Sequence, residues 1–154
     1  MLEWIEGTSV GLWMRESPSV WAFPTILTLH TIGLGILVGA SWLLDLRLLG
    51  FSRNTPLSAF RWVFPAIGFG LVLNLVTGVF LFIKNASTWG TAFPFGVKML
   101  LVVVSVLLLL PIRKYVNRTD AGEVGGSVRL LAIASILAWA GAVTAGRLLA
   151  YLVV

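Results

Sequence analysis

His30, the only histidine of the 154-residue chain, is the side chain whose chemistry stands out first. It lies about ten residues into an apolar run that extends from about residue 20 to residue 44. A helix rises 1.5 Å per residue, so His30 would stand ~15 Å from the start of the run, near the middle of a membrane ~30 Å thick. Ionisable side chains at that depth usually face the protein interior. We therefore expect His30 to face the interior of a helical bundle.

The neighbours of His30 allow two interpretations. Gly33 lies one turn away on the same helix face, and an imidazole beside a glycine in an apolar wall is the arrangement that a haem iron requires. Alternatively, His30 is a neutral structural residue that hydrogen-bonds to Asn74 or Thr77 of the second apolar run. Those two residues, one turn apart, could also orient the free ring nitrogen or line a small polar pocket. On the residues alone, the structural histidine is the simpler interpretation.

Basic side chains could bind an anion beside His30. Lys98 lies a few residues inside the third apolar run, where it either extends to the membrane surface or turns inward to a carboxylate. Lys84 and Arg147 would reach the same surface. Together these cations could bind the propionates of a haem whose iron is held by His30.

Asp45 lies near the end of the first apolar run and needs a partner from another element. Arg61, Arg113 and Arg129 are available, so we expect an ion pair that fixes helix packing. The sequence has no phosphate loop, no pair of carboxylates and no serine triad, so hydrolase chemistry has no support. The absence of cysteine excludes disulfides, iron–sulfur clusters and cysteine-ligated zinc.

Composition and long apolar runs define the elements that must position these residues. Hydrophobic residues make up 58% of the chain and charged residues 11%, far fewer than the quarter or so of a soluble domain. The soluble and disordered classes are therefore excluded. Four apolar runs are each long enough to cross a membrane as a helix, at about 20–44, 62–83, 93–112 and 128–152. The sequence predicts an all-α integral membrane four-helix bundle.

The first 18 residues differ from the rest. Their apolar residues fall near one face of a helix, and Pro18 then interrupts the pattern. We expect a short amphipathic helix lying on the membrane over residues 1–18, followed by the four-helix domain over residues 19–154.

The distribution of basic residues predicts the orientation. Seven of the 11 Lys and Arg flank the side of the first and third loops, and four flank the other side. The positive-inside rule then places both termini outside a bacterial inner membrane. The basic residues stand at the ends of apolar runs rather than in one patch, so we expect lipid as the partner and no nucleic acid.

Helix four carries small residues at four-residue spacing, namely Ala138, Ala142 and Gly146. Such a stripe allows two helices to approach closely. It would join two copies in a homo-oligomer, or it would pack within one chain against Gly33, Gly35 and Gly39 of helix one. The sequence leaves both arrangements open.

Three motifs carry a resemblance to known proteins. They are LHTIGLGILVGASWLLDLRLLG in helix one, FPAIGFGLVLNLVTGVFLF in helix two and AFPFGVKMLLVV at the start of helix three. Over roughly residues 20 to 112 the chain resembles an uncharacterised family of small bacterial four-helix membrane proteins. That family is distantly similar to the HemJ protoporphyrinogen oxidases and to the membrane domain of the CopD copper-resistance proteins.

The resemblance implies a b-type haem, with His30 as the iron ligand and Lys98 as a contact to haem or substrate. With one histidine per chain, the iron would take its second ligand from Met14, Met99, a lysine, water or His30 of another protomer. The implied function is electron transfer or porphyrin or quinol redox in the inner membrane, with a membrane redox partner. The alternative is a cofactor-free scaffold or anchor subunit of a larger complex. Copper handling of the CopD kind has fewer candidate ligands.

Overall fold

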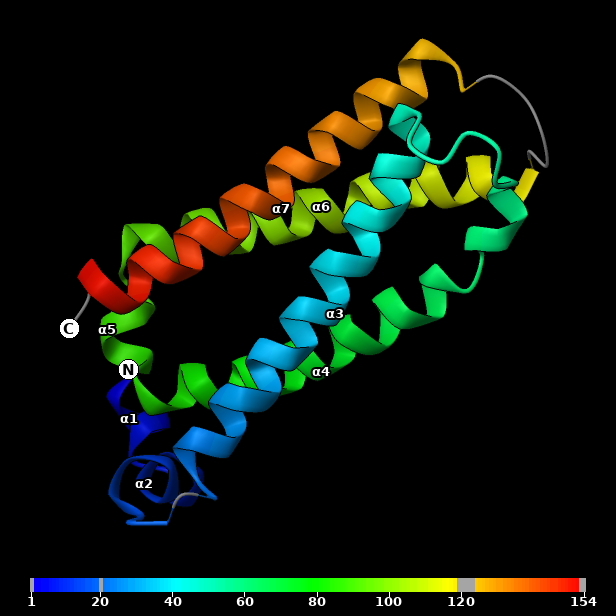
Figure 1. The fold of residues 1–154 in the computed structure, drawn as a ribbon. Helices are drawn as coiled ribbons and strands as arrows, with labels where there is room; N and C mark the ends of the chain where they lie inside the picture. The colour runs from blue at the N-terminus through cyan, green and yellow to red at the C-terminus, as the bar shows by residue number, and fades with distance from the viewer. Residues whose placement is uncertain (1, 20, 119–123, 153–154) are drawn as a thin grey trace.

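The computed structural model describes residues 2–19, 21–118 and 124–152. Within these ranges, four long helices make up most of the chain (Figure 1): α3 (Phe23–Leu49), α4 (Val63–Lys84), α6 (Phe93–Arg118) and α7 (Gly126–Leu152). All four are long and apolar enough to cross a membrane. The predicted all-α bundle of four membrane-length helices is confirmed, and these helices make the chain an integral membrane protein.

Two helices extend beyond the apolar runs that predict them. α3 continues to Leu49, and Gly50 ends it in the left-handed conformation (φ 114°), with its N–H donating to Arg47 O at 3.1 Å. α6 continues through Pro111 to Arg118. A proline removes one backbone hydrogen bond, which helices of a membrane bundle tolerate because neighbouring groups compensate. Hydropathy marks the lipid-crossing part of a helix and therefore misses its more polar end.

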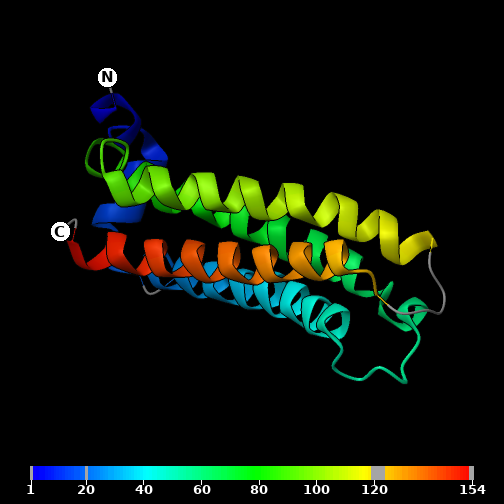
Figure 2. The ribbon, with the colours of Figure 1, turned by 90° about the horizontal axis from the view of Figure 1, so that it is seen from above.

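The long helices form two closely packed pairs. α3 packs along α4, α6 packs along α7, and α3 also contacts α7, whereas α4 and α6 do not pack along their lengths. Figure 1 shows the α3–α4 pair diverging from the α6–α7 pair toward the end where α1, α2 and α5 lie. Figure 2 shows the same helices from above, running side by side. The backbones of the two pairs are therefore farther apart at that end of the bundle.

Two glycines bring α3 and α4 into backbone contact. A Cβ added at Gly70 would lie 2.7 Å from Leu37 N and 3.0 Å from Gly33 O, and one added at Gly33 would lie 3.1 Å from Asn74 N. No side chain fits between the helices here, so the α3–α4 pair is held close at mid-height. Close approach through small residues is how helices associate where lipid supplies no hydrophobic drive.

The small residues of α7 lie inside the chain. Ala138 and Ala142 are buried, and Gly146 lies against the side chain of Lys98 on α6. Gly35 and Gly39 of α3 have open space around them instead, so they do not receive the stripe. The stripe is thus used within one chain.

The apolar core lies toward the end of the bundle opposite α1 and α2. Its fully buried members come from α3, the 3₁₀-helix η1 (Leu57–Phe60), α4, α6 and α7. The largest of them are Trp139, Leu37, Leu44, Leu48, Leu57, Ile112, Val63 and Val116. The cavity described below lies at the other end of the bundle, where α1, α2 and α5 are.

The N-terminal segment forms two helices rather than the single one expected. α1 (Glu3–Glu6) and α2 (Ser9–Glu16) are separated at Thr8, whose hydroxyl caps α2 by accepting from Gly11 N at 3.3 Å. Because Thr8 caps a new helix, the apolar periodicity of residues 1–18 is divided between two helices rather than carried by one. α2 buries Gly11 and Met14.

Glu6 attaches this segment to α5 (Ala86–Trp89). Its Oε1 accepts from Ser87 N at 2.7 Å and from Ser87 Oγ at 2.5 Å, and its Oε2 accepts from Arg15 at 3.3 Å. The hydrogen bonds from Ser87, with a smaller contribution from the Arg15 charge, lower the pKa of Glu6 below its ordinary value. The N-terminal helices are thereby tied to the connection between α4 and α6.

The expected ion pair of Asp45 does not form. Its side chain is fully buried, and neither carboxyl oxygen has a hydrogen-bond partner. Among residues 2–19, 21–118 and 124–152, the one ion pair joins Arg15 and Glu6. Arg113 lies over the Phe64 ring instead, 5.8 Å from its centroid. The basic residues near this end of α3 satisfy other groups and leave the carboxyl without a counter-charge.

Candidate functional site

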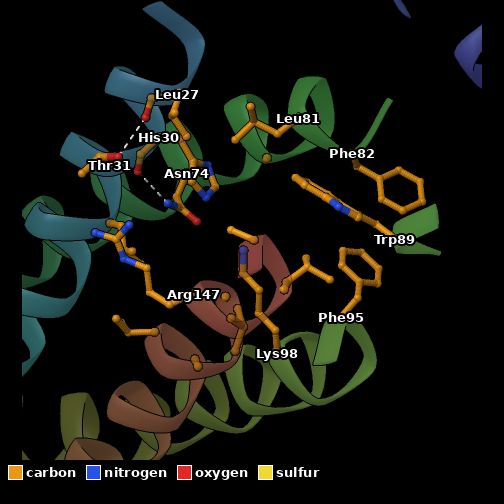
Figure 3. Close-up of a pocket in the computed structure, with 18 of the residues that line it drawn as sticks. Leu27, His30, Thr31, Asn74, Leu81, Phe82, Trp89, Phe95, Lys98 and Arg147 are labelled. Atoms are coloured by element: carbon orange, nitrogen blue, oxygen red, sulfur yellow. Dashed lines mark hydrogen bonds between the residues drawn. The ribbon is translucent and has the colours of Figure 1, made fainter. Parts of the chain in front are cut away.

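A cavity of about 210 Å³ occupies the space between the two helix pairs. All four long helices and α5 contribute to its wall, and Figure 3 shows their side chains directed toward a common centre. The polar and charged residues that line it are His30, Thr31, Asn74, Trp89, Lys98 and Arg147. No acidic residue belongs to the lining among the described residues.

His30 faces this interior, as the sequence predicts, and its Nδ1 lies 3.0 Å from Thr77 Oγ1. The Thr77 hydroxyl has one proton, which it donates to Leu73 O at 2.6 Å, with Asn74 O at 3.3 Å as a second acceptor. Both of those carbonyls can only accept. Thr77 must therefore accept from His30 Nδ1–H, and in the neutral ring the lone pair stands on Nε2. Nε2 is the ring nitrogen left for a ligand.

Asn74 and Gly78 complete the environment of the ring. Asn74 Nδ2 donates to His30 O at 3.0 Å, a bond drawn in Figure 3, and so binds α4 to the α3 backbone beside the imidazole. A Cβ added at Gly78 would lie 3.3 Å from His30 Cε1. The ring therefore packs against a bare stretch of α4, with its Nδ1 and Cε1 side occupied. A ring fixed in this way presents Nε2 at a defined place.

Lys98 and Arg147 supply positive charge to the same cavity. The Lys98 stem lies along Gly146, with its Cδ and Cε 3.5 Å from the position of a Cβ there. Its ammonium group faces the space that His30 also lines (Figure 3). Arg147 lines the cavity and is also exposed. Two cations and no acidic side chain in an apolar wall favour an anionic ligand.

The structure brings most of the predicted site residues together, with Thr77 placed behind His30. Gly33 is placed elsewhere, because it lies in the contact between α3 and α4 rather than in the cavity wall. Lys84 lies over the Phe23 ring, 3.8 Å from its centroid, outside the lining. Met14 of α2 is buried and Met99 of α6 is exposed, and neither lines the cavity.

Sequence reasoning missed the aromatic end of the cavity and Gly78. Phe82 of α4 and Phe95 of α6 stack with centroids 5.1 Å apart, and Trp89 lies beside them (Figure 3). The Trp89 indole nitrogen is buried without a partner. The signal for Gly78 was its place one residue after Thr77. The aromatic residues gave no signal, because their meeting depends on how the segment between α4 and α6 folds.

The side chains fit a haem in their chemistry. His30 offers one imidazole nitrogen of fixed tautomer, the cations Lys98 and Arg147 suit carboxylates, and the remaining wall is largely apolar. The cavity is smaller than the ~300–1,000 Å³ of usual ligand pockets. A ligand as large as haem therefore requires α4 and α6 to separate. The Phe82–Phe95 stack joins these two helices, which do not pack along their lengths.

No protein-family model, no curated protein and no solved structure matches this chain. The resemblance to the HemJ and CopD proteins therefore rests on the sequence motifs alone.

Proposed function

We propose that this integral membrane protein binds b-type haem in the cavity, with His30 Nε2 as the atom that would hold the iron. It would then act in electron transfer or in porphyrin or quinol redox. The observation that supports this most is the hydrogen bond from His30 Nδ1–H to Thr77 at 3.0 Å, because the second nitrogen is left unbonded in the cavity. Histidine ligands of metals are commonly oriented by such a bond from their other ring nitrogen.

The other residues of the site have distinct roles in this proposal. Lys98 and Arg147, which line the cavity, would bind the propionates. Thr77 would fix the tautomer of His30, and Asn74 would fix the helix of His30 against α4. A bound haem would supply a one-electron couple within the membrane.

The test is the visible spectrum of the protein, purified from membranes and again after haemin is added to it in nanodiscs. We expect a Soret band with reduced α and β bands, and its loss in His30→Ala. Thr77→Val should retain haem but shift its reduction potential, because the imidazole loses its hydrogen-bond acceptor. Thr31→Val is the matched control: Thr31 lines the same cavity but donates to Leu27 O of its own helix at 2.9 Å.

A featureless spectrum after haemin addition would overturn the proposal. So would a Soret band that His30→Ala leaves unchanged. A featureless result would leave the cofactor-free scaffold as the remaining function.

A further inference from the structure

A second polar cluster lies in the core, between the cavity and the opposite end of the bundle. Asp45 of α3 and Ser135 and Trp139 of α7 are each fully buried. Both Asp45 carboxyl oxygens, Ser135 Oγ and Trp139 Nε1 lack a hydrogen-bond partner. Buried polar groups are nearly always bonded, so several unpartnered atoms in one region indicate something that binds there.

The three side chains belong to two helices, α3 and α7, that pack against each other. Ser135 and Trp139 are one turn apart on α7, the helix that packs on α3. Ser135 is a polar neighbour of the Asp45 carboxyl, although its hydroxyl has no hydrogen-bond geometry to it. Trp139 also lines the cavity that holds His30. The cluster therefore begins at the cavity wall and continues away from it, and Asp45 stands fifteen residues, about 22 Å, along α3 from His30.

Within the part of the chain that the structure describes, no cation forms an ion pair with Asp45. The basic groups of the surrounding elements are engaged elsewhere or exposed. Arg47 of α3 donates to Thr55 O and Arg53 O, and Arg61, after η1, donates to Asn117 O. Arg113 of α6 lies over Phe64, Arg129 of α7 is exposed, and Lys84 of α4 lies over Phe23 at the other end of the bundle. An ionised carboxylate with neither counter-charge nor hydrogen bonds is strongly disfavoured in such a core.

We propose that Asp45, Ser135 and Trp139 form a buried proton-binding site, in which Asp45 is the neutral acid and a water molecule bridges the three side chains. The set suits one water: the indole N–H donates, the acid donates and accepts, and the serine hydroxyl does both. In the transfer step the Asp45 O–H bond breaks and the bridging water becomes a hydronium ion beside the carboxylate, so the site stays neutral overall until the proton returns to Asp45. A metal ion would be repelled by the indole N–H. The existence of this site does not depend on the proposed function. Only its role in supplying protons to chemistry in the cavity rests on that function.

Infrared difference spectroscopy of the protein in nanodiscs tests the site without haem. At neutral pH the wild type should show the carbonyl stretch of a protonated carboxylic acid, shifted in heavy water, and Asp45→Asn should lose all of it. Ser135→Ala should change the frequency of this band. Ser105→Ala is the matched control, because Ser105 is equally buried but donates to Leu101 O of its own helix at 2.7 Å.

Asparagine resembles the neutral acid, so Asp45→Asn should keep the helical circular dichroism of the wild type. Three results would overturn the proposal: no protonated-acid band at neutral pH, a band that remains in Asp45→Asn, or unfolding of that variant. Carboxylate bands that respond to added sodium would replace the proton with a metal ion. Because the readout is independent of haem, an absent Soret band with a positive infrared result refutes only the proposed function.

Discussion

Replacing Gly70 by Ala tests the close contact that holds the histidine-bearing helix against α4. The added Cβ would lie 2.7 Å from Leu37 N and 3.0 Å from Gly33 O, both backbone atoms that cannot rotate away. An ordinary contact begins at 3.4 Å, so the two helices must separate by about 0.7 Å. Overpacking of this kind costs about 1–3 kcal/mol. The same shift would stretch the bonds that join His30 to α4.

Gly68→Ala, on the same helix, is the matched control, because a Cβ added at Gly68 would have no heavy atom within 4 Å. Both substitutions gain the same helix propensity, about 1 kcal/mol, so their difference isolates the steric cost. We expect Gly70→Ala to be less stable than Gly68→Ala by about 1–3 kcal/mol in reversible unfolding in mixed micelles, followed by circular dichroism. Equal stabilities would refute the reasoning, since they would mean that α3 and α4 do not touch at this glycine.

Three further outcomes follow from other contacts. The pKa of Glu6 is lowered by its bonds from Ser87, so the attachment of α1 and α2 is complete above the ordinary value of 4.5 and weakens as pH falls below it; hydrogen exchange in residues 3–16 should rise there, and Glu6→Gln should remove this pH dependence. Gly11→Ala should release α2, because its Cβ would clash with the backbone oxygen of Glu6, whereas Gly7→Ala, whose Cβ would lie 3.6 Å from the nearest backbone oxygen, should not; near-ultraviolet circular dichroism would show the difference. Gly146→Leu should displace the Lys98 side chain that packs on this glycine. Mass spectrometry should then show faster acylation of the Lys98 amine.

Hydropathy and depth predict the fold and the place of His30 because both depend on local sequence. Four runs of membrane length have few ways to pack, and a histidine in the middle of one must face its neighbours. Thr77 and Asn74 were predictable partners for the same reason: they are the polar groups at similar depth on the next helix. The structure adds which atom bonds to which, and hence the tautomer.

The remaining features depend on the rotation of one helix against another. Gly33 shares a helix face with His30 in sequence, yet it packs on α4 because backbone contact there needs two glycines at one height. The sequence offers Arg61, Arg113 and Arg129 as partners of Asp45. In the structure Arg61 donates to Asn117 O, Arg113 lies over the Phe64 ring and Arg129 is exposed. Sequence spacing alone does not distinguish between the candidate partners of Gly33 or Asp45. The packing of the helices decides which of them come into contact.

The separation of α4 from α6 has a consequence for how a molecule would reach the cavity. These two helices both contribute to its wall and show mostly exposed apolar side chains on their outer faces, such as Leu75, Val79 and Val103. A compound arriving between them travels within the bilayer. Its effective concentration is then set by how strongly it partitions into lipid. The hydrophobicity of the compound and the membrane composition therefore govern occupancy of the cavity more than the concentration dissolved in the surrounding buffer.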